Sequence, residues 1–392
     1  MIKPKTYYFY SLFITFLIVI SILCGCVSNQ INGKKEKVEN KSTNAFESSL
    51  NAKEQLGKLL FFEESLSTPP GQACSDCHAP EVAFADPETE LPVSRGAHSD
   101  RYGNRNDMTI SYSAFVPPLH FNEDEEVWVG GLFWDGRVNS LAEQSKGPLL
   151  NPLEMANPDT LTILKKLESL SYAELFTEIY GPDALSNPNI AFNNMADAIE
   201  AYEKTSEVSP FTSKYDYWLR GEIELNEQEL RGLKLYEAED KGNCAACHPN
   251  TISADGSPPL FTDFTYDNLG VPPNSENPFY SLPQELNPDG FEFVDLGLGK
   301  TLNDPEQDGK FRVPTMRNVA VTSPYMHNGI YKTLFSVLAF YNTRDVAEWP
   351  EPEVAQNVNI DELGDLKLTN NELEDLVAFL RTLTDGWEKP NE

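Results

Sequence analysis

The chain is poor in basic residues. It contains 30 Lys and Arg against 61 Asp and Glu, which gives a formal net charge of −31 over 392 residues. Nucleic-acid binding depends on clustered basic side chains that neutralise phosphates, so this composition argues against a nucleic-acid partner. A strongly acidic surface either keeps a protein soluble or attracts a basic partner, and the sequence leaves both alternatives open.

Cysteine is scarce as well. Of the six cysteines, four lie in two motifs described below, and the other two, Cys24 and Cys26, end an apolar N-terminal stretch. No cysteine is therefore left for a structural disulfide bond. The chain is long enough for two domains with hydrophobic cores of their own.

The N-terminal stretch has the form of an export signal. Two lysines precede an apolar run over residues 7–23, which is followed by Cys24-Gly25-Cys26. This pattern predicts a lipoprotein-type signal peptide over residues 1–26, with Cys26 as the lipidated first residue of the mature chain. An uncleaved membrane anchor is the alternative. Either one tethers the folded part outside the cytoplasm, in the periplasm or on the outer face of the cell membrane, and residues 27–50 are expected to form a flexible linker.

Two copies of the motif C-x-x-C-H stand far apart, at residues 74–78 and 244–248. In c-type haem attachment the two thiols bond to the porphyrin and the histidine binds its iron. A zinc site or a redox-active thiol pair would leave the adjacent histidines unexplained. The sequence therefore predicts two covalently bound haem c groups, attached through Cys74, Cys77, His78, Cys244, Cys247 and His248.

The regions around the two motifs share one plan. Asn51 with Glu54 and Asn226 with Glu229 are typical of capped helix starts ahead of each motif. Downstream, Trp-Asp-Gly at 134–136 and His-Asn-Gly at 327–329 are each followed by a leucine at the same distance. We therefore expect a mainly α fold with two cytochrome c-like haem domains in tandem and long irregular loops. The expected domains span residues 51–210 and 221–385, and residues 253–310, dense in Pro, Gly, Asp and Asn, are expected to cover the second haem.

Longer strings extend this pattern. They are FWDGR (133–137), EQSKGPLLNPLEM (143–155), PTMRNVAVTSPYMHNG (314–329) and FYNTRD (340–345). With these strings the chain, over roughly residues 50–385, resembles the bacterial di-haem cytochrome c peroxidases and their relative MauG, the methylamine-utilisation maturation enzyme. The resemblance implies that hydrogen peroxide reacts at the N-terminal haem, on His78, and that electrons enter at the C-terminal haem, on His248.

The resemblance also assigns roles near the first haem. Glu154 matches the distal carboxylate that moves a proton during peroxide cleavage, Gln144 matches its hydrogen-bonding partner, and Trp134 matches the bridge between the haems. From the residues alone, Trp134 could be a core aromatic, and Glu154, after Asn151-Pro152, could stand in the first turn of a helix, where acidic residues are favoured.

The iron ligand on the far face of each haem has more than one candidate in the sequence. Tyr341 stands where the peroxidases have a methionine and where MauG has a tyrosine ligand, so it is expected to bind the second haem. The alternatives are a core tyrosine on an apolar helix face and ligation by Met326 instead. His98 lies one residue later than the loop histidine that caps the first haem in many relatives, so it is either that ligand or a loop residue without a metal.

Two further assignments follow from the resemblance. Asn106, Thr322 and Pro324 match positions that bind one calcium ion between the domains, through oxygen ligands that suit a hard cation; a plain structural loop is the alternative. Arg317 is expected to pair with a haem propionate.

Three functions remain open at this stage. The first is a peroxidase that reduces hydrogen peroxide with electrons from a small donor protein, a cytochrome c or a cupredoxin. The second is MauG-like oxidation of a partner protein or its cofactor precursor by peroxide, which Tyr341 favours. The third is a non-catalytic di-haem electron carrier. A homodimer is left open for all three.

Overall fold

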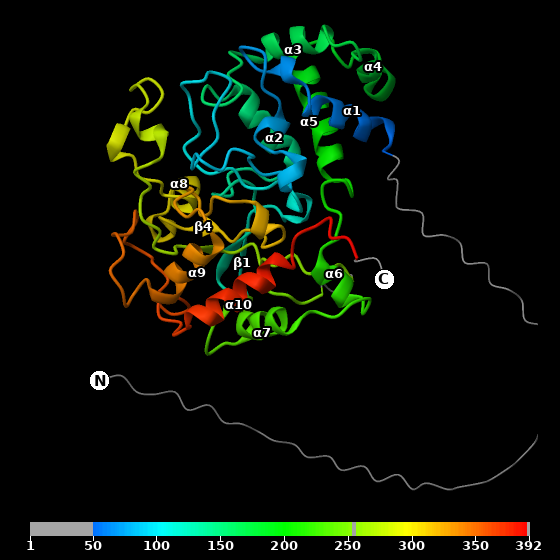
Figure 1. Ribbon diagram of the computed structural model, residues 1–392. Coiled ribbons are helices and arrows are strands. Elements are labelled where there is room, and N and C mark those ends of the chain that lie inside the picture. Colours follow the sequence, from blue (N-terminus) through cyan, green and yellow to red (C-terminus); the bar gives the residue numbers. More distant parts are fainter. Residues whose placement is uncertain (1–49, 253–255, 390–392) are drawn as a thin grey trace, which may run out of the picture. The chain divides into compact units, whose positions relative to one another are not determined.

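Two pairs of helices cross each other, one pair in the first half of the chain and one pair in the second (Figure 1). The computed structural model describes residues 50–252 and 256–389. The predicted signal peptide, Cys26 and almost all of the predicted linker therefore lie outside the described residues. Within the described residues, no helix is both long and apolar enough to cross a membrane.

The secondary structure is mainly helical, with a few very short strands. The helices are α1 (Ala52–Phe61), α2 (Leu141–Leu150), α3 (Thr160–Glu168), α4 (Glu174–Tyr180), α5 (Pro188–Glu203), α6 (Lys214–Leu219), α7 (Glu227–Glu237), α8 (Leu298–Leu302), α9 (Leu334–Thr343) and α10 (Asn370–Arg381). The strands β1 (His120–Asn122) and β2 (Val127–Val129) form one antiparallel pair, and β3 (Tyr266–Asp267) and β4 (Phe311–Arg312) form another.

The capped helix starts predicted from the sequence are confirmed. The Asn51 side chain accepts from the backbone N–H of Glu54, whose carboxylate accepts from the Asn51 N–H in return. The same capping box, formed by Asn226 and Glu229, opens α7. Such reciprocal bonds satisfy backbone donors that a helix start leaves free. They fix where each helix begins ahead of its C-x-x-C-H motif.

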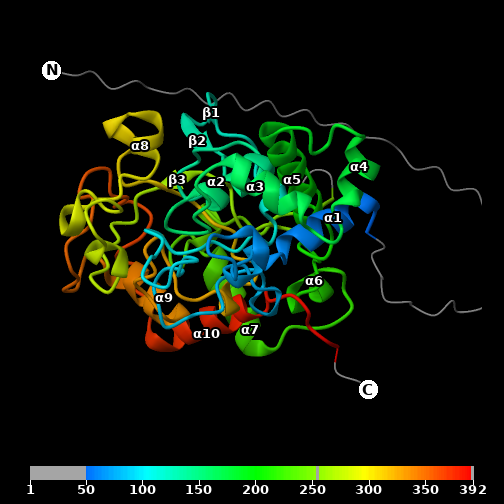
Figure 2. The ribbon, with the colours of Figure 1, turned by 90° about the horizontal axis from the view of Figure 1, so that it is seen from above.

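Each half of the chain has a hydrophobic core of its own. In the first half α1 packs across α5, and the buried cluster around them includes Leu56, Leu60 and Ile199. In the second half α7 packs across α10, with Leu376, Phe379 and other side chains from α10 at the centre of a separate cluster. The two views in Figures 1 and 2 agree in placing α1 beside α5 and α7 beside α10.

A glycine makes each helix crossing close. A Cβ atom on Gly57 would lie 1.9 Å from the carbonyl oxygen of Ala198, and one on Gly232 would lie 2.0 Å from that of Asp375. Only glycine allows backbones to approach to this distance without a shift. Next to these carbonyls, Tyr202 faces Gly57 and Phe379 faces Gly232. The two crossings therefore correspond residue by residue, with α5 matching α10.

A second segment is also repeated in the two halves of the chain. Residues 132–138 and 325–331 are each closed by an antiparallel β-bridge between their first and last residues. The second residue of each has a φ of 63° and 72°, and the glycine at the fifth position has 70° and 65°. Helices α2 and α9 then begin at Leu141 and Leu334. Each residue in this region thus corresponds to the one 193 positions later, as the sequence pattern predicted.

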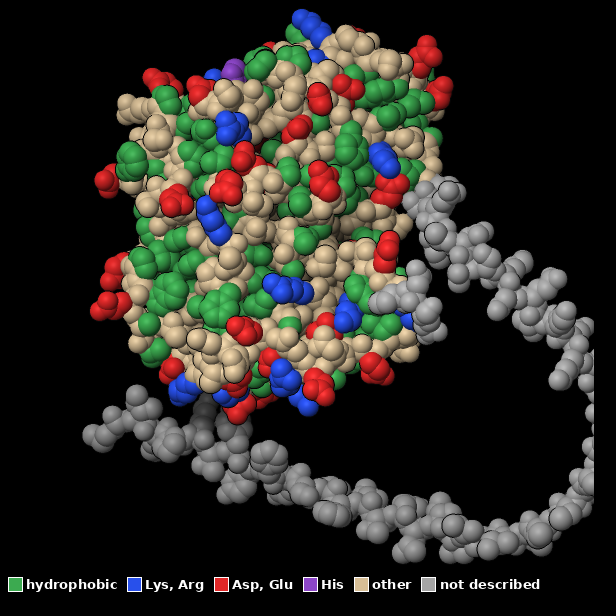
Figure 3. Space-filling model, in the orientation of Figure 1, with side chains coloured by type: hydrophobic (Ala, Val, Ile, Leu, Met, Phe, Trp, Pro, Cys, Tyr) green, Lys and Arg blue, Asp and Glu red, His purple; other side chains and the backbone are tan. Residues whose placement is uncertain are grey.

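The surface carries mixed charge. On the face shown in Figure 3, lysine and arginine side chains are dispersed among acidic ones, with apolar side chains between them. The acidic excess of the sequence is therefore distributed over this face rather than gathered in one block.

Candidate active site

Two cavities occupy the interior of the described structure. The first cavity, of about 160 Å³, is lined by Cys74, Cys77 and His78. The second cavity, of about 220 Å³, is lined by Cys244, Cys247 and His248. Each C-x-x-C-H motif therefore faces a cavity of its own.

The two motifs fold identically. In each, a single 3-10 turn, Cys74–Asp76 or Cys244–Ala246, brings the two cysteines to one side. The N–H of each histidine donates to the carbonyl of the first cysteine at 2.9 Å. The turn therefore presents two thiols and one imidazole to the same space, which is the arrangement that haem attachment needs.

Both histidines are oriented for iron binding through Nε2. His78 Nδ1 donates to the carbonyl oxygen of Phe84 at 3.2 Å, and His248 Nδ1 donates to that of Phe261 at 2.8 Å. A hydrogen bond of this kind fixes the tautomer and leaves the other nitrogen as the ligand. Burial lowers the pKa of His248 to about 4, so its imidazole is neutral and its lone pair is available at neutral pH.

The side chain of Arg312 places a buried positive charge beside both cavities, where it can pair with an anionic group of a cofactor. Arg312 on β4 lines both cavities and is 5% exposed. Its guanidinium donates to the Phe133 carbonyl and contacts the Met108 sulfur. Burial lowers its pKa, and no carboxylate of the described residues is among the groups that shift it. A buried charge without a counter-ion is costly. The carboxylates of haem propionates would supply one, so the residues present fit the predicted cofactor.

Glu154 is poised in the first cavity. Its Oε1 accepts from Asn151 Nδ2 at 2.9 Å, whereas its buried Oε2 has no hydrogen-bond partner in the described structure. Burial, together with the charge of Asp107, raises the pKa of Glu154 to about 7. A carboxyl group with this pKa can both accept and release a proton near neutral pH.

The helix-start alternative for Glu154 is wrong. The residue lies in a turn after α2, and the next helix, α3, begins only at Thr160. The helix dipole therefore gives no reason for an acidic residue at this position. What the turn does provide is a bend that brings Glu154 back to the cavity that α2 also lines.

Gln144 and Trp134 both line the first cavity. Gln144, on α2, lines the first cavity together with Glu154. Trp134 lines both cavities, and its indole N–H donates to the carbonyl oxygen of Asn106 at 2.8 Å. Because Arg312 also donates its backbone N–H to the Trp134 carbonyl at 2.8 Å, the indole is held between the cavities from both halves of the chain.

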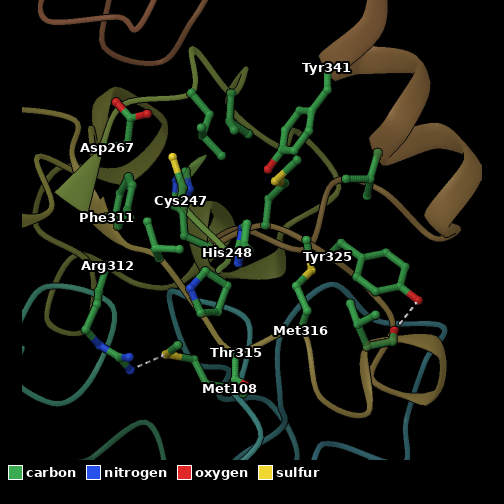
Figure 4. Close-up of a pocket in the computed structure, with 18 of the residues that line it drawn as sticks. Met108, Cys247, His248, Asp267, Phe311, Arg312, Thr315, Met316, Tyr325 and Tyr341 are labelled. Atoms are coloured by element: carbon green, nitrogen blue, oxygen red, sulfur yellow. Dashed lines mark hydrogen bonds between the residues drawn. The ribbon is translucent and has the colours of Figure 1, made fainter. Parts of the chain in front are cut away.

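Tyr341 faces the second cavity. Figure 4 shows its hydroxyl pointing from α9 into the cavity, whose wall also carries Cys247 and His248. Burial of the hydroxyl, with the neighbouring Cys247 and Asp267, raises the pKa of Tyr341 above its usual value. The helix face expected as ordinary core is directed at the same cavity, since Leu334, Val337 and Leu338 line it as well.

The repeat shows what the first cavity has at the corresponding position. Pro148, inside α2, stands 193 residues before Tyr341 and lines the first cavity as Tyr341 lines the second. Proline has no side-chain atom that can bind a metal. The two cavities are therefore built on one backbone plan but differ in the group they present opposite the histidine.

The remaining predicted ligands lie at different places. Asn106, Thr322 and Pro324 all line the second cavity, and Asn106 Nδ2 donates to the Pro92 carbonyl at 3.1 Å. His98 is not among the residues that line the first cavity. Its loop is nevertheless close to Glu154, whose carbonyl accepts from the Ala97 N–H at 2.8 Å.

Arg317 departs from the prediction. It is 1% exposed, lines neither cavity, and donates to both carboxylate oxygens of Asp216 at 3.0 and 2.9 Å and to the Pro259 carbonyl at 2.7 Å. Its charge is therefore neutralised within the protein, which removes the reason to pair it with a propionate. Arg312 is the arginine that has a reason to pair with a propionate. In the sequence it is only a basic residue two positions before PTMRN, which is not enough to identify it.

Two cavities, each with two cysteines and an oriented histidine, define a di-haem c-type redox protein. Comparison with known proteins agrees. Residues 51–224 match the family model of the di-haem cytochrome c peroxidases. The methylamine utilization protein MauG of Paracoccus denitrificans is 38% identical over 86% of this chain and 89% of its own, and the cytochrome c551 peroxidase of Pseudomonas aeruginosa is 32% identical over 78% and 75%. The diheme peroxidase BthA of Burkholderia thailandensis superposes with a TM-score of 0.76 at 34% identity, over 85% of this chain and 86% of BthA.

The chain belongs to the di-haem cytochrome c peroxidase family, which includes MauG. It is accordingly an oxidoreductase that acts on peroxide, and its family implies two haem c groups. The alternative of a non-catalytic electron carrier is not retained.

Proposed function

We propose that hydrogen peroxide is reduced to water in the first cavity, with electrons that enter from an external donor through the second cavity. The observation that carries this proposal is the difference between corresponding positions. Pro148, which lines the first cavity, has no side-chain atom that can bind iron, whereas Tyr341, at the corresponding position of the second, has a hydroxyl that points into the cavity. This assignment makes residues 51–210 the peroxidatic haem domain and residues 221–385 the electron-transfer haem domain.

When bound, haem c supplies an iron that exchanges single electrons and, at an open face, binds peroxide. The protein has to move a proton from the near oxygen of peroxide to the far one, so that water can leave. We assign this transfer to Glu154, whose Oε2 is buried, lacks a partner among the described residues and faces the cavity. Gln144, in the same wall, is assigned to hold peroxide in position by a hydrogen bond.

Trp134 is assigned to carry electrons between the sites. Its contact with both cavities supports this role, because electron transfer through a protein weakens steeply with distance and an aromatic ring shortens the gap. The Asn106 carbonyl that accepts from its indole N–H holds the ring in place. Calcium bound by Asn106, Thr322 and Pro324 would fix the same wall, which is our proposal for that ion.

A second function is favoured by Tyr341. A phenolate ligand stabilises oxidised iron and lowers its potential, which makes the second site a poor acceptor from a high-potential donor. Peroxide-dependent oxidation of a partner protein, the MauG-like alternative, would use such a site to hold an oxidising equivalent. The 38% identity to MauG of Paracoccus denitrificans is consistent with this alternative but does not identify a substrate.

Absorption and EPR spectra of the haem-loaded protein test both functions. The spectra are recorded in the oxidised and half-reduced states, before and after one equivalent of hydrogen peroxide. We expect one haem with an open face and one with an oxygen ligand from Tyr341 on its far side. Rapid return to the resting spectrum with a cytochrome c or cupredoxin donor supports the peroxidase. A two-electron-oxidised protein that persists in the donor's presence supports the MauG-like function, and two haems inert to peroxide would contradict both.

Two subsidiary proposals concern the resting state of the first haem and the location of the protein. For the resting first haem we propose the alternative in which His98 is a loop residue without a metal, because His98 does not line the first cavity. The resting spectrum tests this, since a capped first haem has two nitrogen ligands. We also propose that the protein works outside the cytoplasm, tethered through Cys26 or an N-terminal anchor.

A further inference from the structure

A second carboxyl group lies buried at the first cavity. Glu203, the last residue of α5, is 3% exposed and lines the cavity on the side of Cys74. Its Oε2 is buried and has no hydrogen-bond partner in the described structure. Leaving a buried polar atom unpaired costs free energy, so such a group in a native protein calls for an explanation. Peroxide chemistry by Glu154 does not provide one.

The repeat shows that this carboxyl group is a difference between the two sites. The glycine crossings pair Tyr202 with Phe379, so Glu203 on α5 corresponds to Leu380 on α10. Leu380 lines the second cavity just as Glu203 lines the first. One position in the same wall is therefore apolar in one half and ionisable in the other, and packing alone would be served by leucine in both.

The charges near Glu203 do not neutralise it. On its own helix, Glu200 is paired with Lys204 at 2.5 Å. Two other elements face Glu203. Lys58 of α1 is already paired with Glu207 at 2.6 Å, and the turn Cys74–Asp76 carries an acidic residue and no basic one. Burial, and secondarily the charge of Glu200, raises the pKa of Glu203 to about 8. Burial, followed by the charges of Glu207 and Glu203, raises the pKa of the neighbouring Tyr202.

We propose that Glu203 couples the redox state of the first haem site to a proton. It keeps its proton while the site is reduced and releases it to solvent when the site loses an electron. The positive charge added by oxidation is then balanced by the carboxylate, and the net charge of the site does not change. Leu380 cannot respond in this way, so the second site has no such coupling.

The coupling predicts how the reduction potential of the first haem depends on pH. Oxidation that releases a proton becomes easier as the proton concentration falls, so the potential decreases with rising pH. For one electron and one proton the limiting slope is about 59 mV per pH unit, because this is the potential change for a tenfold change in concentration. The potential of the second haem serves as an internal reference in the same molecule.

Spectroelectrochemical titration of the two-haem protein between pH 5 and 9, without peroxide, tests the proposal. The variants are Glu203→Gln, which keeps the shape but cannot ionise, and Glu203→Leu, which copies the second half. Glu178→Gln, at an exposed position of α4 and with no part in the pKa of Glu203, is the control. We expect the slope of the first haem near pH 8 to fall in both Glu203 variants and to be kept in the control, while haem content stays at two per chain; the contribution of Glu154, near pH 7, is the same in all of them.

Retention of the slope in Glu203→Gln would show that another group takes up the proton and would overturn the proposal, as would a wild-type potential independent of pH. Loss of haem from Glu203→Leu alone leaves Glu203→Gln as the deciding variant. The inference rests on haem attachment at both sites but not on peroxide turnover. Because the potentials are measured without peroxide, failure of the proposed peroxidase function and failure of this inference give different results.

Discussion

Replacing Glu154 by Gln is expected to separate catalysis from stability. Glutamine keeps the size of the side chain and the bond to Asn151 can be retained, but Oε2, the atom without a partner in the described structure, can no longer exchange a proton. General acid–base groups contribute roughly 10²–10⁴-fold to rate. We therefore expect peroxide turnover to fall by about this factor. In the wild-type protein, turnover should rise with pH through about 7, where Glu154 becomes able to accept a proton.

The same substitution should stabilise the protein at high pH. The pKa of Glu154 is raised from its ordinary value of 4.5 to about 7 in the folded chain. Below pH 4.5 the group is protonated whether the chain is folded or not, so it has no effect on stability. As pH rises from about 4.5 to 7, the unfolded chain gains from ionisation and the folded chain does not. Each pKa unit is about 1.4 kcal/mol, so roughly 3 kcal/mol of stability is lost above pH 7, and Gln avoids this loss.

The assay combines steady-state peroxide turnover with thermal unfolding of the haem-loaded protein at pH 5 and pH 8. Glu154→Gln should lose activity at both pH values but gain melting temperature only at pH 8. Glu168→Gln, at the exposed end of α3, is the control and should change neither. Full activity in Glu154→Gln would refute the proton-transfer role. Unchanged stability at pH 8 would refute the raised pKa instead.

Four other substitutions test the remaining parts of the site and the fold. Tyr341→Phe should remove an oxygen ligand and change the EPR signal of the second haem alone, because its hydroxyl faces only that cavity. Trp134→Phe, which is harder to oxidise, should slow electron transfer between the haems in stopped-flow experiments while haem content stays the same. Gly232→Ala should lower the free energy of unfolding by about 1–3 kcal/mol or more, because its Cβ would overlap the Asp375 carbonyl. Gly147→Ala, with no contact shorter than 3.5 Å, should raise helix stability by about 1 kcal/mol, and denaturant unfolding measures both.

Local signals were sufficient for much of the fold. The capping boxes of α1 and α7 depend on residues three apart, so the sequence shows them directly. The spacing of the two Gly turns at residues 134–136 and 327–329 likewise revealed a repeat, because a positive φ favours glycine at the last residue of each turn. Patterns of this kind do not depend on what the rest of the chain does.

Long-range pairings were not predictable in the same way. Arg317 and Asp216 are 101 residues apart, and only the fold shows that this guanidinium is already neutralised. Conversely, Arg312 is an ordinary basic residue in the sequence, and its importance comes from burial beside both cavities without an acidic partner in the described part of the chain. Glu203 was missed for the same reason, since a carboxylate at a helix end is usually exposed.

The duplicated frame explains how one chain can hold two similar groups in different states. The helix crossings and the Gly turns are the same in both halves, so they cannot distinguish the two sites. The two sites differ at single positions of that frame: Pro148 of the first half corresponds to Tyr341 of the second, and Glu203 corresponds to Leu380. In the functions proposed above, one pair decides which site offers an open face, and the other decides which site can exchange a proton on oxidation. Because both choices fall on the first cavity, the site that needs protons to make water is also the site equipped to handle them.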